Sequence, residues 1–272
     1  MNTNYSVLKE VKNTISLKIL FTWLLLMSLP LIYFAITRNN YIFEDSLSVF
    51  THMLEGILPL LFPIIATIIY LGSFSQEIKN RFLVYTRLRI PLKKLLLIKF
   101  SANFVLSFSL FFIFTFAMFL FSFYIEPLLG IIRYDPDVNL YSLNGITVEQ
   151  ELYTRHTFTQ LLQYGSLTYG LLYSCWLGIN AAAYASLGFF LLILLGNQFL
   201  ALSIPTLIYL LGGYLLDAVD LGQFDFRHTL FPYSRTQQPI WTTFVPFLFL
   251  VFVSTCLYVY IKKHFHRLDN LL

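Results

Sequence analysis

The stretch QEIKNRFLVYTRLRIPLKKLLLIK, from Gln76 to Lys99, lies between two long uncharged runs and orients the whole chain. It carries seven of the 18 Lys and Arg residues of this 272-residue chain but only one acid, Glu77. Its basic residues are Lys79, Arg81, Arg87, Arg89, Lys93, Lys94 and Lys99. Because basic connectors between apolar spans stay on the cytoplasmic side of a membrane, the stretch predicts a cytoplasmic loop over residues 76–99.

The composition is that of an integral membrane protein. Hydrophobic residues make up 57% of the chain and charged residues 12%, whereas soluble domains contain about 25% charged residues. The two cysteines, Cys175 and Cys256, lie inside apolar runs and are too far apart in sequence for a metal-ligand pattern or a small disulfide framework. We interpret both as small hydrophobic packing residues.

Charge-free runs predict six transmembrane helices in one all-α domain, because a spanning helix needs about 20 apolar residues. The predicted spans are residues 19–37, 52–76, 100–125, 167–195, 199–216 and 240–261. The run from Thr157 to Leu216 is too long for one helix, and Gly196-Asn197-Gln198 is the predicted break. Residues 1–18 have apolar side chains at helical spacing, which predicts an amphipathic helix in the membrane interface rather than a simple basic flank.

Six spans place both termini on one side of the membrane, and the distribution of charge predicts which side. The N-terminal segment, the 76–99 loop and the C-terminal tail together carry 13 basic residues and three acids. The segments on the other side, chiefly residues 126–166 and 217–239, carry five basic residues and 11 acids. We therefore expect a multi-pass protein of the cell membrane with both termini in the cytoplasm and two extracellular loops.

The sequence contains no motif of an enzyme or of a nucleotide-binding domain. It has no G-x-x-x-x-G-K-[ST] phosphate loop, and no G-x-S-x-G, H-E-x-x-H or Cys-x-x-Cys. The five histidines are scattered near span ends and in loops, a pattern that indicates neither a metal site nor a catalytic one. We therefore expect a chain that is not itself an enzyme, binds no cofactor or metal, and has no nucleic-acid partner.

Polar residues at membrane depth are few. Glu55 comes closest to an ionisable group in the hydrocarbon, but its position near the outer end of the second span favours a solvated helix end over a transport role. Asn103, Ser107 and Asn180 either line a path or hydrogen-bond a neighbouring helix, and we prefer the second interpretation. These four residues are the candidates for a translocation path.

The basic loop itself has a helical pattern with one interruption. Apolar periodicity continues beyond Gln76, so the second span is expected to project into the cytoplasm. Ile90-Pro91 then ends that helix, because a residue before proline disfavours helical geometry whereas proline itself can begin a helix. Leu92 to Lys99 would be the next helix. This basic elbow either sets topology and attracts anionic lipid, at about 1 kcal/mol per basic residue, or docks a cytoplasmic protein.

The elbow resembles that of the permease subunits of type-2 ATP-binding-cassette exporters. The matching residues are Glu77 at the end of the second span, TRLRIPLKK from Thr86 to Lys94, and Lys99 entering the third span. The six spans, the amphipathic N-terminal helix and the turn before Pro205 are also similar. Many members of that family carry a Gly-Thr pair a few residues after the glutamate, where this chain has Asn80-Arg81-Phe82.

The resemblance implies that the elbow is a coupling helix seated in a cleft of a separate cytoplasmic ATPase subunit, which binds the ATP and Mg²⁺. It also implies a second permease subunit, identical or different, and export of a hydrophobic or amphipathic substrate such as a peptide, drug or lipid. The implied ATPase-contact residues are Glu77, Arg81, Arg87, Arg89, Pro91, Lys93 and Lys94. The alternative is a non-transporting membrane scaffold or sensor that recruits a cytoplasmic partner through the same loop.

Overall fold

The computed structural model describes residues 6–80, 90–135, 153–233 and 235–264. About 80% of these residues are helical and none of them lies in a strand. Six of the described helices are long and apolar enough to span a membrane, which confirms the predicted all-α, multi-pass class. They are α2 (Leu17–Thr37), α4 (Leu58–Lys79), α6 (Leu92–Leu120), α9 (Ser166–Leu195), α10 (Gln198–Ala218) and α11 (Trp241–Lys263).

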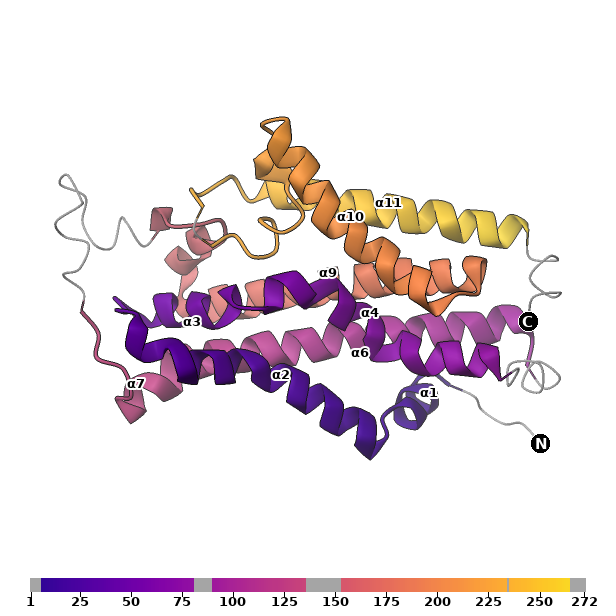
Figure 1. Ribbon diagram of the computed structural model, residues 1–272, viewed down its shortest axis with the longest axis horizontal. Coiled ribbons are helices and arrows are strands. Elements are labelled where there is room, and N and C mark those ends of the chain that lie inside the picture. Colours follow the sequence, from indigo (N-terminus) through magenta and orange to yellow (C-terminus); the bar gives the residue numbers. More distant parts are fainter. Residues whose placement is uncertain (1–5, 81–89, 136–152, 234, 265–272) are drawn as a thin grey trace.

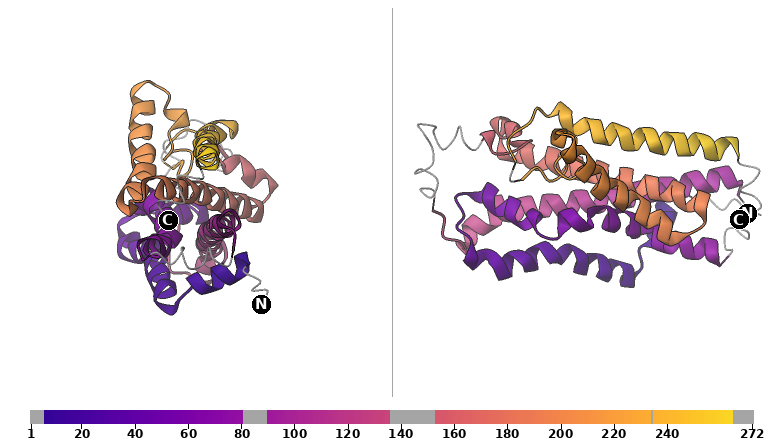
Figure 2. Two further views of the ribbon diagram at one scale, coloured as in Figure 1. Left: turned by 90° about the vertical axis from the view of Figure 1, so that its right-hand side faces the viewer. Right: turned by 45° about the horizontal axis from the view of Figure 1, so that its top comes forward.

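Shorter helices flank these six. They are α1 (Val7–Thr14), α3 (Ser46–Glu55), α7 (Glu126–Leu129), a π-helical turn (Phe121–Ile125) and 3-10 turns at Arg38–Asn40, Thr159–Tyr164 and Gly222–Phe224. One end of the bundle gathers α1, the start of α6 and the C-terminal ends of α4 and α11 (Figure 1). We call this the connector end. The opposite end, which we call the loop end, gathers α3, α7 and the segment that follows α10 (Figures 1 and 2).

Helix α9 is the centre of the bundle, because it packs against α4, α6, α10 and α11 and is buried over most of its length. Glycines allow the close approach. A Cβ atom on Gly178 would lie 2.9 Å from the backbone oxygen of Phe108 in α6. One on Gly188 would lie 2.7 Å from the Leu71 side chain in α4. Small residues at such crossings let helix backbones pack closely in membranes, where van der Waals contact drives association.

Turn residues fix where the helices begin and end. Gly196 adopts the left-handed conformation (φ +63°) after α9, and the Asn197 side chain accepts hydrogen bonds from the backbone of the first turn of α10. The chain therefore turns at the predicted Gly196-Asn197-Gln198. Pro91 directly precedes α6, which runs without a break from Leu92 into the third span. Helices α2, α9, α10 and α11 begin and end within about two residues of the predicted spans.

The second span differs from the prediction of residues 52–76. The chain before it folds as a separate helix, α3, which begins at a capping box formed by Asp45 and Ser48 and ends at Glu55. Gly56 then has a non-helical backbone (ψ −125°), and α4 begins at Leu58. The charge-free run begins at Gly56, and the predicted span extends upstream across Glu55 to residue 52. Because a single glycine does not by itself end a helix, this extension assigns the end of α3 to the start of α4.

The close contact at Gly178 generates the first prediction. Gly178→Ala should lower the free energy of unfolding by about 1–3 kcal/mol, because the new methyl group meets a backbone oxygen that cannot rotate away. Gly72→Ala is the matched control, since no heavy atom lies within 4 Å of its added Cβ. Thermal unfolding of both variants in detergent measures the difference. Equal midpoints for the two variants would contradict the proposed packing.

Candidate functional site

Three helices meet at a buried lysine at the connector end. Lys99 of α6 is only 2% exposed. Its Nζ atom lies 2.8 Å from Oε1 of Glu10 in α1 and 2.6 Å from Oε2 of Glu77 in α4. Glu10 is buried as well, whereas the Glu77 side chain is 34% exposed. The lysine therefore ties the N-terminal helix to the two helices that flank the 76–99 elbow, and we call these three residues the Lys99 cluster.

Further groups in α4 complete the surroundings of the Lys99 cluster. The Tyr70 hydroxyl donates a hydrogen bond of 2.7 Å to Oε1 of Glu10, and the Phe74 ring lies 5.4 Å from Lys99 Nζ. Tyr70, Phe74 and Glu77 succeed one another by four and three residues, so they share one face of α4. A buried charge is costly unless it is paired and hydrogen-bonded, and removing one partner of such a pair typically costs about 3–5 kcal/mol.

The structure places the predicted ATPase-contact residues in different surroundings. Glu77 belongs to the Lys99 cluster, and its exposed fraction leaves part of the carboxylate accessible. Pro91, Lys93 and Lys94 are exposed at the start of α6. The other predicted contact residues, Arg81, Arg87 and Arg89, lie outside the described residues. Contact of this set with an ATPase stays a prediction.

The four candidate path residues differ in their surroundings. Ser107 is fully buried and donates to the backbone oxygen of Ala66, and Asn180 donates to the oxygen of Trp176 within α9. Asn103 is fully buried one turn beyond Lys99, and neither atom of its amide has a hydrogen-bond partner in the described structure. Glu55 is exposed at the end of α3, outside the long helices. Their role in a path stays a prediction.

Glu10 is the site residue that sequence reasoning missed. In the sequence it stands as one acid among the basic residues of the N-terminal segment. The available signal was its position, because Val7, Glu10, Val11 and Thr14 follow helical spacing on one face of α1. Glu10 and Thr14 are buried on that face, and the Thr14 hydroxyl donates to the backbone oxygen of Glu10. An acid on the apolar face of an amphipathic helix indicates a buried partner.

A second charged cluster lies at the loop end. Asp225 is fully buried, accepts hydrogen bonds from the backbone and guanidinium of Arg227, and lies 2.9 Å from Nδ1 of His228. Burial acts to raise the pKa of Asp225, but His228 and Arg227 hold it below its ordinary value. Asp217, Asp225 and His228 offer ligand atoms within 4.8 Å of one another. Because Arg227 already contacts both carboxylates, we interpret the cluster as an ion-pair network rather than a metal site.

His156 is a buried histidine at the loop end. It is 4% exposed, and its Nδ1 lies 2.9 Å from the backbone oxygen of Thr157. Its Nε2 is buried without a partner in the described structure. Burial lowers the pKa of His156 to about 4; the Thr157 contact raises it and the charge of Arg155 lowers it. The imidazole is therefore neutral at pH 7, with the Nδ1 proton donated to Thr157.

No protein-family model, curated protein or solved structure matches this sequence. Function is therefore inferred from the geometry of the chain itself. Within that geometry, the Lys99 cluster is the feature that links the predicted elbow to the membrane-spanning helices.

Removing the Lys99 charge should destabilise the bundle. Lys99→Met leaves Glu10 and Glu77 facing each other without their cation, so we expect a loss of about 3–5 kcal/mol in the free energy of unfolding. The control is Lys94→Met, which removes an exposed lysine one turn from the start of the same helix. Adding Glu10→Gln to Lys99→Met should restore part of the loss. Thermal unfolding of the four proteins, wild type included, measures these effects, and equal stability of the two single variants would overturn the importance of the cluster.

Acidification should destabilise the loop end through His156. The unfolded chain takes up the histidine proton near pH 6.5 and the folded chain only near pH 4, so stability is full above about pH 6.5 and is lost as the pH falls through this window. The linkage corresponds to about 2 kcal/mol between pH 7 and pH 5. His156→Gln should remove this part of the pH dependence, and His264→Gln, at the connector end, should retain it. An unchanged pH profile in His156→Gln would contradict the assignment.

Proposed function

We propose that the chain is the permease subunit of an ATP-driven exporter for a hydrophobic or amphipathic substrate. A separate cytoplasmic ATPase subunit docks on the 76–99 elbow. The observation that carries the proposal is the Lys99 cluster. Helix α4 precedes the elbow and α6 follows it, and the ion pairs of Lys99 join these two helices to each other and to α1. A force applied to the elbow is therefore transmitted to α4 and α6 together.

The charges at the two ends of the bundle support a cytoplasmic position for the elbow. Lysines gather at the connector end, among them Lys79, Lys93, Lys94, Lys262 and Lys263. Acidic residues gather at the loop end, among them Glu44, Asp45, Glu126, Asp217, Asp220 and Asp225. This polarity supports insertion with the lysine-rich end inside the cell, where the elbow would be within reach of a cytoplasmic protein.

The proposed mechanism divides the work between two polypeptides. The ATPase holds ATP and Mg²⁺, and its closure displaces the elbow. Because Lys99 holds Glu77, the cytoplasmic ends of α4 and α6 move as one unit against α9, which both helices contact through the glycines at their crossings. A second permease subunit forms the other wall of the path. This chain contributes no bond-making chemistry, and its part is to convert the movement of the elbow into a change of access.

Charge reversal in the elbow tests the docking. The triple variant Arg87→Glu, Arg89→Glu and Lys94→Glu should lose the ATP hydrolysis that co-purifies with the tagged chain from its own cell membranes, because it opposes an acidic docking cleft. The matched control reverses three other basic residues of the same predicted side, Lys9, Lys12 and Lys263. Both variants should reach the membrane in equal amounts. The proposal is overturned if wild type brings down no nucleotide-hydrolysing subunit, or if the triple variant keeps it.

Reconstitution separates the exporter from a scaffold or sensor. The purified complex is placed in vesicles. A fluorescent amphiphile and ATP are then both supplied on the side that carries the elbow. An exporter moves the amphiphile in proportion to ATP hydrolysis, and Lys99→Met slows the movement more than it slows hydrolysis. A scaffold binds the ATPase and moves nothing.

A further inference from the structure

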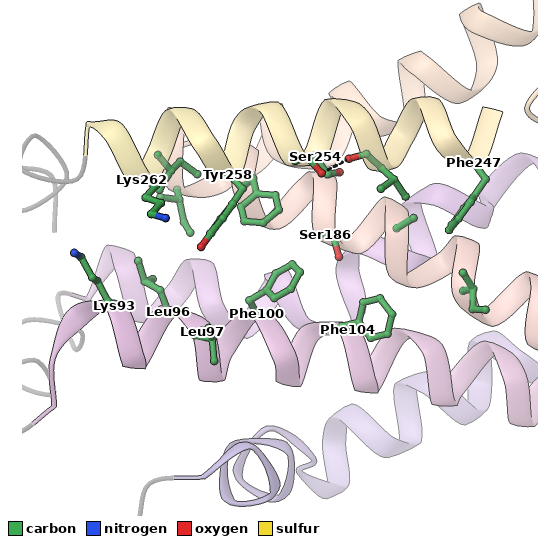
Figure 3. A pocket seen from close by; sticks show the side chains of 17 residues that line it. Lys93, Leu96, Leu97, Phe100, Phe104, Ser186, Phe247, Ser254, Tyr258 and Lys262 are labelled. Atoms are coloured by element: carbon green, nitrogen blue, oxygen red, sulfur yellow. Dashed lines mark hydrogen bonds between the residues drawn. The ribbon is translucent and has the colours of Figure 1, made fainter. Parts of the chain in front are cut away.

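An elongated cavity of about 620 Å³ opens between α6, α9 and α11 (Figure 3). This volume lies within the range of about 300–1,000 Å³ that is typical of small-molecule sites. The side chains that line it are mostly apolar, with Leu96, Phe100 and Phe104 on α6 and Phe247 and Val251 on α11. We call this cavity the α6–α11 pocket. It is separate from the Lys99 cluster, which faces α1 and α4 on the other side of α6.

Two lysines stand at one end of the pocket. Lys93 begins the lining on α6 and Lys262 ends it on α11, and Figure 3 shows both at the same end of the pocket. Their neighbours in sequence, Lys94 and Lys263, are also exposed but do not line the pocket. The hydroxyl group of Tyr258 lies one turn deeper on α11. The pocket is therefore cationic at the connector end, and beyond Tyr258 its lining is mostly apolar, with Ser186, Ser254 and Thr255 as the hydroxyl residues.

The length of the pocket matches one leaflet of a bilayer. The lining runs over eleven residue steps on α6, from Lys93 to Phe104, and over fifteen on α11, from Phe247 to Lys262, which correspond to about 16 and 22 Å of helix. Half of a hydrocarbon core of roughly 30 Å is about 15 Å, and half of a bilayer with its head-group region is about 20–22 Å. A helix from a second copy of the chain would cross the whole core, whereas this lining fits the head group and chain of a lipid from one leaflet.

A buried hydroxyl group inside the pocket lacks a partner. Ser254 lines the pocket on α11, is 9% exposed, and its Oγ has no hydrogen-bond partner in the described structure. Ser186 lines the pocket on α9 and differs, because its hydroxyl donates to the backbone oxygen of Ala182. Because an unpaired buried hydroxyl costs free energy, we expect Ser254 to hydrogen-bond an occupant of the pocket.

We propose that the α6–α11 pocket binds an anionic phospholipid of the cytoplasmic leaflet. The phosphate lies between Lys93 and Lys262, the glycerol ester carbonyls lie between Tyr258 and Ser254 and accept from the Ser254 hydroxyl, and an acyl chain continues between α6 and α11 towards Phe104. Attraction between lysines and anionic lipid head groups favours this occupant over a neutral one. Lipid binding of this kind requires the membrane orientation proposed above but not ATP-driven transport.

The test uses phosphatidylglycerol that carries a photoreactive diazirine in its acyl chain, added to the purified chain in nanodiscs. After illumination, peptides with Phe100 to Phe104 and with Val251 to Tyr258 should be labelled. The double variant Lys93→Glu and Lys262→Glu should lose labelling of these peptides about tenfold, because two attractive charges become repulsive. The double variant Lys94→Glu and Lys263→Glu is the matched control and should keep it.

Two further arms test the selectivity for charge and the position of the acyl chain. The same diazirine on phosphatidylcholine should label these peptides weakly, and Ala183→Trp, which fills the pocket from α9 without changing charge, should reduce labelling by phosphatidylglycerol. Equal labelling by both lipids, or equal labelling in the two lysine variants, would overturn the proposal. The elbow variant Arg87→Glu, Arg89→Glu and Lys94→Glu should keep its lipid label, so failure of ATPase docking and failure of lipid binding are distinct outcomes.

Discussion

A single buried cation organises the connector end of this bundle. Lys99 is held by Glu10 and Glu77, and the Tyr70 hydroxyl bonds the same Glu10 oxygen. In a low-dielectric interior each of these charges is tolerated only because the others are present, so the three helices that supply them hold one another in place. Helix α1 in particular is short, and its burial of Glu10 and Thr14 depends on this contact. The geometry of the elbow's two ends is therefore set by one lysine.

Much of the fold was predictable because a membrane imposes length and polarity on its helices. Uncharged runs predicted the six long helices, and Pro91 and the Gly196 turn marked helix ends by their backbone preferences. The break at Gly56 was marked only by Glu55 and by the glycine itself, neither of which must end a helix, so the predicted second span includes the end of α3. Glu10 was missed because charge was counted by segment rather than by helix face. Pairing of charges across helices requires the packing itself, which the order of residues does not contain.

Most polar side chains in the long helices serve the backbone of their own helix. The hydroxyls of Thr67 and Ser186 and the amide of Asn180 all donate to a carbonyl four residues earlier. Such bonds satisfy a polar group locally without a partner helix or water. From the sequence we preferred hydrogen bonds to a neighbouring helix for residues of this kind; Ser107 makes such a bond to α4, whereas Asn180 bonds its own helix. Several buried side chains of the long helices lack a partner in the described structure, Asn103, Thr115 and Ser254 among them, and of these three only Ser254 lines the α6–α11 pocket.

The first turns of α6 connect the two proposals. Lys93 and Lys99 are six residues apart, so they project from different faces of the helix, one towards α11 and the other towards α1 and α4. A movement of the elbow that keeps Lys99 on Glu77 carries α6 with it and changes the distance between Lys93 and Lys262. A lipid phosphate between these lysines would favour one position of α6 over the other. Because such coupling is reciprocal, a lipid that biased α6 would also bias the elbow, and the proposed ATPase, when bound to the elbow, would change the affinity for the lipid.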